Sequence, residues 1–252
     1  MKALWKLAWI EVKLFAREPI AVIFSFAFPF FVLFIMASVF GNEIEQPEPG
    51  EEDPWRGVGP TDYYVPAYIG LVMTSIGVIT LPMRITGYRE QGVLRRFHAA
   101  GVPLAAVLGS QVLVSLGMML IGTVVIAISS PIAYGTLGPQ SPAETAAAFL
   151  LSALAFASIG IFLGSALPSG RSAQGAGLIL FFVMMMVSGA GPPRGVLSST
   201  MVTIGDTLPM THVVLLLQGA WLDQGWDWSA FCVVAAFLVL PGALAWRLFR
   251  WG

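Results

Sequence analysis

Residues 19–41 read PIAVIFSFAFPFFVLFIMASVFG, a stretch without a single charged side chain. A helix needs about 20 mostly apolar residues to cross the hydrocarbon core of a bilayer. The apolar run is continuous and lacks the alternating segments, each about ten residues long, that form barrel strands. The stretch therefore predicts a transmembrane helix.

Five further stretches of the same kind follow, and their interiors hold no Lys, Arg, Asp, Glu or His. The six predicted spans are Pro19–Gly41, Asp62–Met83, Pro103–Ser130, Pro142–Leu167, Ser172–Gly191 and Ser229–Trp246. Of the 252 residues, 57% are apolar and only 11% are charged, with a mean hydropathy of +0.81. Soluble domains carry about 25% charged residues. We therefore predict an all-α integral membrane protein, with one six-helix transmembrane domain over residues 19–252.

The basic residues are distributed unequally between the two sides of these spans. With the N-terminus inside, 11 of the 13 Lys and Arg residues lie on the cytoplasmic side, and only Arg56 and Arg194 lie outside. Cytoplasmic loops of membrane proteins carry an excess of Lys and Arg. The bias predicts that both termini are cytoplasmic, which agrees with an even number of spans.

Residues 1–18 precede the first span and have an amphipathic pattern. Basic residues at positions 2, 6, 13 and 17 share one helical face, and apolar residues share the other. This pattern predicts an interfacial helix in the headgroup region. Glu11 falls on the apolar side. It is either a carboxylate that reaches the cytosolic edge or one half of a tertiary ion pair, because a charge on a buried face needs a partner.

The stretch 192–228 differs from the spans around it. Pro192 and Pro193 end the fifth span, and the later apolar run Val213–Trp221 is too short to cross a membrane. We expect a re-entrant or interfacial helical hairpin on the outer side, whose backbone is covered by protein.

Two local patterns concern the fourth span. Ser141, Pro142 and Glu144 predict an N-cap, a first-turn proline and a capping-box partner at its start. Gly160 and Gly164 predict close helix packing, as small residues four positions apart do in many membrane bundles.

The sequence lacks the residues for several kinds of chemistry. The phosphate-binding loop of an ATPase needs Gly-Lys-Ser/Thr, yet all three Lys residues lie at or before position 13. His98 and His212 lie on opposite sides of the predicted membrane, so they cannot share a metal ion. The net charge of −1 argues against a nucleic-acid partner. Six helices without an energy source predict that a partner protein supplies the energy.

The cytoplasmic segment 84–102 is the largest internal one and the candidate contact for such a partner. Residues 89–96 read Arg-Glu-x-Gly-x-Leu-Arg-Arg, and a short helix here has one apolar and one polar side. The apolar side holds Val93, Leu94 and Phe97, and the polar side holds Arg95, Arg96 and His98. For Arg84, membrane anchoring by positive charge is the preferred interpretation.

These features together resemble the permease subunits of ATP-binding-cassette type 2 exporters, the group that includes the daunorubicin-type drug exporters. The resemblance rests on the 89–96 motif ending at Pro103, together with Arg17-Glu18-Pro19, Ser188-Gly189 and Leu208-Pro209-Met210-Thr211-His212. Gly191-Pro192-Pro193 replaces a commoner aromatic-Pro pattern, and Gln218 stands where an Arg is frequent.

The resemblance implies a half-transporter in the plasma (inner) membrane. Two copies pair, and each docks a cytosolic ATPase subunit that binds ATP and Mg, so this chain itself is no enzyme and holds no cofactor. The helix Glu90–His98 is then the coupling helix. The implied contacts with the ATPase are Arg89, Glu90, Leu94, Arg95, Arg96, Phe97 and His98.

The expected substrate is an amphipathic or lipophilic solute: a drug, a lipid or a lipid-linked molecule. Aromatic and methionine side chains suit such a solute. The translocation-path candidates are Phe24, Phe28, Phe31, Phe181, Met184 and Met185, and the outer-gate candidates are Pro192, Pro193 and Pro209. The alternatives are a membrane-lipid enzyme or assembly factor and an ion-coupled secondary transporter. The spans hold neither a catalytic polar cluster nor a charged relay for them.

Overall fold

The computed structural model describes Lys13, residues 19–44 and residues 53–248. The predicted interfacial helix 1–18, apart from Lys13, and Glu11 lie outside the described residues. Within them the chain forms helices and turns, and no strand. In order they are α2 (Pro19–Val22), η1 (Ile23–Ala27), α3 (Phe28–Phe40), α4 (Pro60–Ser75), η2 (Ile76–Thr80), α5 (Leu81–Glu90), α6 (Val93–Ala99), α7 (Leu104–Tyr134), α8 (Pro142–Ala166), α9 (Gly170–Val187), η3 (Arg194–Val196), α10 (Ser199–Asp206), α11 (Pro209–Trp221) and α12 (Trp228–Leu248).

Six of the described helices are long and apolar enough to cross a membrane. They are Ile23–Phe40, Pro60–Glu90, Leu104–Tyr134, Pro142–Ala166, Gly170–Val187 and Trp228–Leu248. The prediction of an all-α protein with six spans is confirmed. Two helices run further than predicted, because α5 continues past Met83 to Glu90 and α7 continues past Ser130 to Tyr134.

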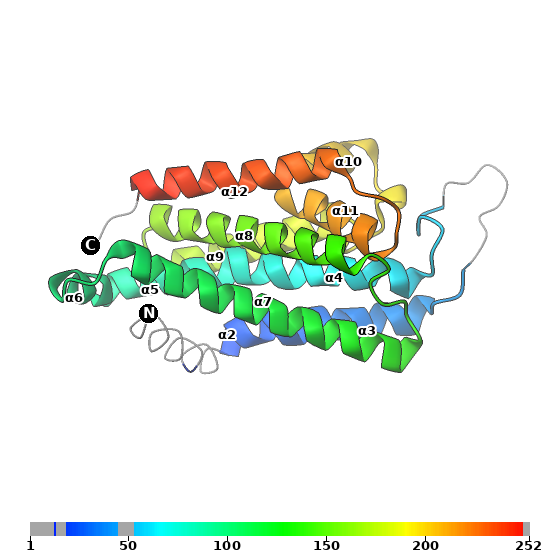
Figure 1. Cartoon of the computed structure of the whole chain (residues 1–252), viewed down its shortest axis with the longest axis horizontal. Helices are drawn as coiled ribbons and strands as arrows, with labels where there is room; N and C mark the ends of the chain where they lie inside the picture. The colour runs from blue at the N-terminus through cyan, green and yellow to red at the C-terminus, as the bar shows by residue number, and fades with distance from the viewer. Residues whose placement is uncertain (1–12, 14–18, 45–52, 249–252) are drawn as a thin grey trace.

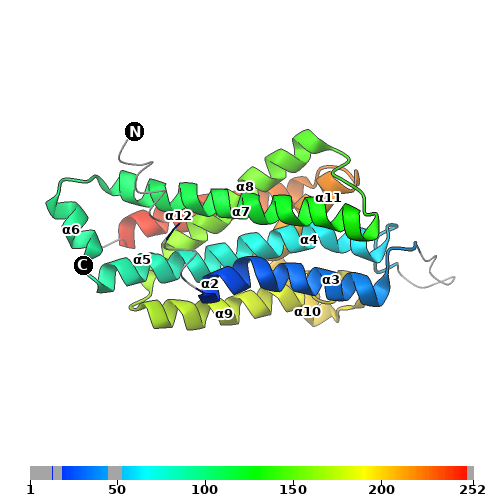
Figure 2. The same ribbon diagram turned by 90° about the horizontal axis from the view of Figure 1, so that it is seen from below.

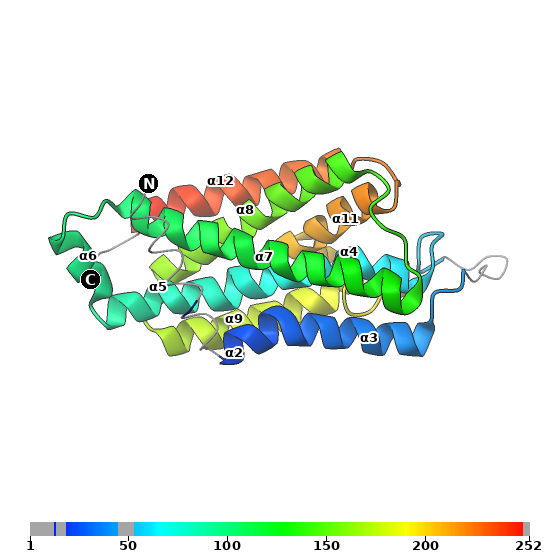
Figure 3. The same cartoon turned by 60° about the horizontal axis from the view of Figure 1, so that its bottom comes forward.

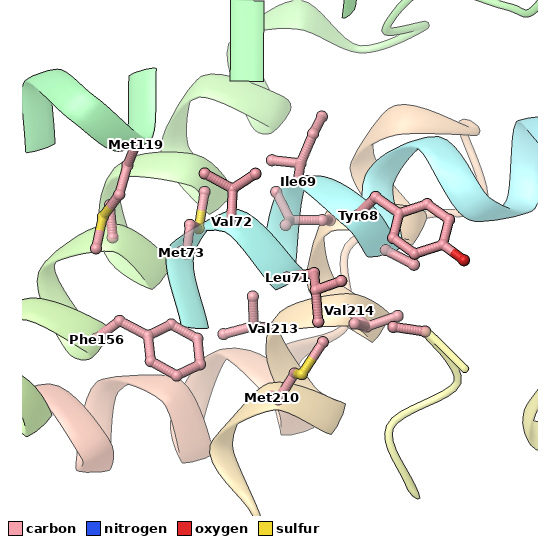
Figure 4. Packing of buried hydrophobic residues seen from close by; sticks show 14 of the residues in the cluster. Tyr68, Ile69, Leu71, Val72, Met73, Met119, Phe156, Met210, Val213 and Val214 are labelled. Carbon is pink, nitrogen blue, oxygen red and sulfur yellow. The ribbon is translucent and has the colours of Figure 1, made fainter. Parts of the chain in front are cut away.

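The second span is the centre of the bundle. The segments α4, η2 and α5 form one helix, and every residue of α4 and η2 is buried. Helices α3, α7, α8, α9 and α11 all contact it, and it runs through the middle of Figure 1. Figure 4 shows the core around it, where Met119 of α7, Phe156 of α8 and Val213 of α11 converge on α4.

The first two spans each contain one π-helical turn, η1 and η2. A proline follows each turn closely, at Pro29 and Pro82, and proline offers no N–H and crowds the preceding turn. The two turns face each other, because the hydroxyls of Ser25 and Thr80 lie 3.2 Å apart. A hydrogen bond thus joins the two irregular turns inside the bundle.

Glycines let α8 and α9 approach the second span at backbone distance. A Cβ at Gly160 would lie 2.5 Å from the carbonyl oxygen of Gly77, and one at Gly164 would lie 2.8 Å from Cβ of Ile85. The predicted close packing at Gly160 and Gly164 is confirmed. On α9, a Cβ at Gly177 would lie 2.2 Å from the carbonyl oxygen of Val78.

The predicted capping box at the start of α8 is wrong. Pro142 does occupy the first turn, but the Ser141 side chain makes no cap hydrogen bond. Its hydroxyl lies 3.0 Å from Oδ1 of Asp223, in the link that leads to α12. A tertiary contact has replaced the local one.

The bundle has two distinct ends, which we call the α6 end and the α11 end. Figure 1 shows α6 and the C-terminal end of α12 at one end, and α11 with the C-terminal end of α3 at the other. At the α11 end, the carboxylate of Asp62 accepts hydrogen bonds from Nδ2 of Asn42 at 3.0 Å and from the N–H of Leu137 at 2.7 Å. This buried acid therefore ties the ends of three spans together.

Candidate coupling site and translocation cavity

At the α6 end, a glycine turn separates the second span from a short helix. α5 ends at Glu90, and Gly92 adopts a left-handed conformation (φ +66°) that glycine accepts without steric cost. α6 then begins at Val93. The predicted coupling helix Glu90–His98 is therefore corrected, because Glu90 belongs to the transmembrane helix and only residues from Val93 onward form the separate one.

The side chains of α6 form a buried apolar side and an exposed polar side, as the sequence pattern predicts. This division changes which residues can contact the ATPase. Leu94 is 2% exposed and packs inside the chain itself. Phe97 is half-buried, while Arg95, Arg96 and His98 are exposed. Arg96 donates to the carbonyl oxygen of Gln91 at 3.0 Å, which braces the turn. Arg95, Arg96 and His98, with the half-buried Phe97, thus make the surface that α6 presents outward, and Leu94 does not.

Arg89 and Glu90, at the end of α5, both contact the turn between α8 and α9; Arg89 is half-buried and Glu90 is exposed. Nη1 of Arg89 lies 3.4 Å from the carbonyl oxygen of Gly164 and 3.3 Å from that of Ser165, and Nη2 donates to the carbonyl of Leu167. Oε2 of Glu90 accepts from the N–H of Gly170 at 3.0 Å. Of the predicted coupling residues, these two contact other spans of the same chain.

The position of Arg84 does not fit its interpretation as a membrane anchor. It is 6% exposed and lies on the buried face of α5. A side chain that reaches for lipid headgroups must be accessible, so simple anchoring does not describe it. The sequence pattern offered no sign of this, because Arg84 directly follows a predicted span end.

The phenylalanines of the first and fifth spans form a packed seam. Figures 2 and 3 show α3 and its preceding turns beside α9. Phe24 and Phe28 meet Phe181 with ring centroids 6.0 and 5.7 Å apart, and Phe182 extends the same cluster. Phe31 is 64% exposed and points away from the seam. Three of the four phenylalanine candidates thus come together and one does not.

An apolar cavity of about 610 Å³ lies beside this seam, toward the α11 end. Its wall comes from α3, from Tyr64 and Tyr68 of α4, and from Met185 and the residues that follow α9. Pro192 and Pro193, two of the gate candidates, also line it. Met184 is buried at 4% exposure but is not part of the wall.

Polar groups around the cavity are few. The Tyr64 hydroxyl donates to the carbonyl oxygen of Gly191 at 2.9 Å. The Tyr68 hydroxyl is buried and has no hydrogen-bond partner within the described residues. Such an orphaned group costs free energy unless something binds it.

A short strap, residues 53–58, covers the cavity at the α11 end. Trp55 forms part of the cavity wall and packs edge-on against Tyr63 and Tyr64. The carboxylate of Asp53 accepts from the N–H groups of Trp55 and Gly57 and so shapes the turn. The sequence analysis did not single out Trp55, so the strap was missed.

The strap is fastened to α11 by Gln218. Oε1 of Gln218 accepts from Nη1 of Arg56 at 3.1 Å, and Nε2 donates to the carbonyl oxygen of Tyr63, also at 3.1 Å. Gln218 is 1% exposed, and its amide oxygen and its amide nitrogen each have one partner in these contacts. The sequence did contain a sign of this role, because Gln218 stands where an Arg is frequent in the family.

The stretch 192–228 forms two helices joined at a sharp bend. α10 and α11 meet at 91°, and Pro209 begins α11 directly after the break. Asp206 at the end of α10 pairs with Arg194 at 2.9 Å, and its carbonyl oxygen lies 2.9 Å from Nε2 of His212. Pro209 is buried at the bend and does not line the cavity, in contrast to Pro192 and Pro193.

The described residues contain no group of three or more His, Cys, Asp or Glu that could hold a metal ion. The site consists of a packed seam, an apolar cavity and a helix presented at the opposite end. The cavity offers an apolar surface, and few polar groups of the described residues lie around it.

Comparison with protein families agrees with this geometry. The family described as ABC-2 type transporter matches residues 2–222 of the 252. The match covers most of the chain, so this protein belongs to the ABC-2 type transporter family. It is a multi-pass membrane protein and the permease component of an ATP-binding-cassette exporter, not its ATPase. No curated protein matches the chain.

Proposed function

We propose that this permease exports an amphipathic or lipophilic solute through the apolar cavity between the first, second and fifth spans. The cavity itself is the observation that carries the proposal, because its wall is apolar except for a few tyrosine and backbone groups. Ligand sites of this kind bury most of the ligand and use few polar contacts to orient it. Drugs, lipids and lipid-linked molecules fit that description, and the daunorubicin-type subgroup remains a prediction.

The energy comes from a cytosolic ATPase subunit that docks on α6. The exposed Arg95 and His98 offer hydrogen-bond donors on the same short helix as the half-buried aromatic side chain of Phe97. Aromatic and Arg residues are enriched at the centres of protein interfaces. The α6 end is then cytoplasmic, as the basic bias predicts, and the membrane is the plasma membrane.

A second copy of the chain closes the cavity. Next to the cavity, α9 exposes a continuous apolar face that includes Phe182, Val183 and Met186. Pairing of two copies through this face covers the open side of the cavity and places two α6 helices at the same end. Homodimers and pairs with a related permease both satisfy this arrangement.

Nothing in the described residues favours the two alternatives. The buried acid Asp62 is engaged by Asn42 and Leu137 in a structural contact, as described above. An ion-coupled transporter needs an accessible ionisable group in its path, and a lipid enzyme needs a cluster of reacting groups.

The test is purification of the permease with its ATPase, followed by ATP hydrolysis across a panel of lipophilic drugs and lipids. We expect at least one compound to stimulate hydrolysis, and Met36→Trp, which places a larger side chain in the cavity wall, to reduce that stimulation. Ile35→Trp is the matched control, because Ile35 lies on the same helix and is exposed outside the cavity. Equal loss in both variants would contradict the cavity as the binding site.

A further inference from the structure

Arg89 contacts the last turn of α8 and the residue after it. Its guanidinium lies against the carbonyls of Gly164, Ser165 and Leu167, which are among the last four carbonyls of that helix or directly follow it. These carbonyls have no partner within the helix and carry the negative end of its dipole. A cationic side chain is therefore a favourable partner for the C-terminal end of α8.

Glu90, the next residue, contacts the first turn of α9. Its carboxylate accepts from the N–H of Gly170, the first residue of that helix. The positive end of a helix dipole favours an anion. A Cβ at Gly170 would lie 3.3 Å from Oε2 of Glu90, so glycine at this position allows the close approach.

The two contacts span one short turn. Only residues 167–169 separate α8 from α9, and the two side chains of opposite charge each contact the helix end of complementary sign. Both come from the end of α5, one turn before α6 begins. Movement of α6 therefore reaches α5 through the chain, and it reaches α8 and α9 through these two side chains.

We propose that Arg89 and Glu90 are positioning residues that transmit the movement of α6 to the fourth and fifth spans, and that they do not bind the ATPase. The inference rests on the proposed function, since it needs an ATPase that moves α6. It replaces two of the predicted ATPase contacts with an internal linkage. The internal linkage leads to α9, which ends beside the cavity and carries Met185 in the cavity wall.

The test compares three variants of the permease purified with its ATPase: Arg89→Met, Glu90→Gln and Arg95→Met. The first two should retain ATPase binding, and the amount of substrate moved per ATP hydrolysed should fall, by about tenfold in Arg89→Met, which loses hydrogen bonds from a charged group. The fall should be smaller in Glu90→Gln, which keeps an acceptor for the N–H of Gly170 but loses the charge. Arg95→Met, on the exposed side of α6, should weaken ATPase binding itself. Arg89→Lys keeps the charge at the end of α8 and should restore part of the coupling, since a lysine offers fewer donors.

A distance measurement gives a readout that general destabilisation does not produce. With the single cysteine Cys232 replaced by Ser, spin labels are placed at Gln91 and at Arg171, which follow Glu90 and Gly170 in the chain. In the wild-type complex the label distance should stay constant when a non-hydrolysable ATP analogue is added. In Glu90→Gln it should broaden or change with the nucleotide, because the two helix ends then move separately.

The outcomes separate the two proposals. If Arg89→Met and Glu90→Gln lose ATPase binding as Arg95→Met does, the two residues are docking contacts and the linkage is wrong, while the proposed function stands. Unchanged coupling with an unchanged label distance would also overturn the linkage. If the wild-type permease binds no ATPase at all, the proposed function fails first.

Discussion

Arg56 and Gln218 are far apart in the sequence, yet Nη1 of Arg56 donates to Oε1 of Gln218 at 3.1 Å. The same glutamine also binds the carbonyl of Tyr63, so one buried side chain joins the strap, the second span and α11. The strap carries Trp55 over the cavity. Gln218 is therefore one of the residues that hold the strap over the cavity, together with Gln224, whose Nε2 donates to the carbonyl oxygen of Arg56 at 2.9 Å.

Gln218→Leu should release the strap. A hydrogen bond to a charged group contributes about 1.5–3 kcal/mol, so the strap should open far more often in the variant. We expect faster hydrogen exchange at residues 53–58 and stronger quenching of Trp55 fluorescence by a water-soluble quencher. Gln218→Glu keeps an acceptor for Arg56 and serves as the control. Equal exchange in the wild type and Gln218→Leu would show that the strap is held by other contacts.

Gly177→Ala and Gly175→Ala form a matched pair on α9. The Cβ at position 177 would lie 2.2 Å from the Val78 carbonyl oxygen, whereas position 175 has nothing within 4 Å. Forced overpacking costs about 1–3 kcal/mol, and an exposed helical Gly→Ala change stabilises by up to about 1 kcal/mol. Thermal denaturation in detergent should show a lower midpoint for Gly177→Ala and an unchanged or higher one for Gly175→Ala. The opposite order would contradict the close approach of α9 to η2.

Asp227 is expected to stabilise the start of α12 as its N-cap. Its Oδ1 accepts from the Ser229 hydroxyl at 2.7 Å and from the Ala230 N–H at 2.9 Å. Burial raises the pKa of this carboxyl, but these hydrogen bonds outweigh burial and the pKa is lowered overall. Asp227→Ala should cost about 1 kcal/mol of stability at neutral pH.

The lowered pKa gives this contribution a definite pH dependence. The stabilisation is fully present above the pKa of the unfolded chain, about 3.9 for an aspartate. It is lost as the pH falls through the lower pKa of the folded state. Wild type and Asp227→Ala should therefore differ in melting temperature at pH 7 and converge under strongly acidic conditions. A difference that grows on acidification would contradict the capping role.

Glu11 lies outside the described residues, and its pairing stays a prediction from the sequence. A carboxylate on the apolar side of an interfacial helix needs a cationic partner in the cytoplasmic layer or on the ATPase. Glu11→Gln should then alter assembly or coupling, as measured by co-purification and by ATP hydrolysis. If Glu11→Gln and Glu11→Leu both behave as wild type, Glu11 is only a surface carboxylate.

The sequence predicted the spans well because their signal is strong and local. In a chain of this composition, an apolar run as long as α7 predicts a membrane-spanning helix. Proline is favoured in the first turn of a helix, which is where Pro142 lies in α8. The close packing at Gly160 was predictable for the same reason, since small residues at helical spacing indicate backbone contact.

The site was only partly predictable, because its contacts join residues far apart in the chain. Phe24 and Phe181 could be chosen as candidates because they are aromatic. Nothing in either segment indicates that these two rings meet or that Phe31 is exposed instead. The family resemblance placed Arg89 and Glu90 among the ATPase contacts, and nothing in the sequence indicated their contacts with the turn between α8 and α9. Their use depends on where the α8–α9 turn lies, and a single sequence does not contain that information.

The most direct test of the central claim, a permease driven through α6 by a separate ATPase, is native mass spectrometry of the complex purified from its own membrane. We predict two permease chains with two ATPase subunits, and dissociation of the ATPase in Phe97→Asp. Thr200→Asp, exposed on α10 at the opposite end, is the control and should leave the complex intact. A stable, active lone chain, or an ATPase that stays bound equally in Phe97→Asp and Thr200→Asp, would contradict the account.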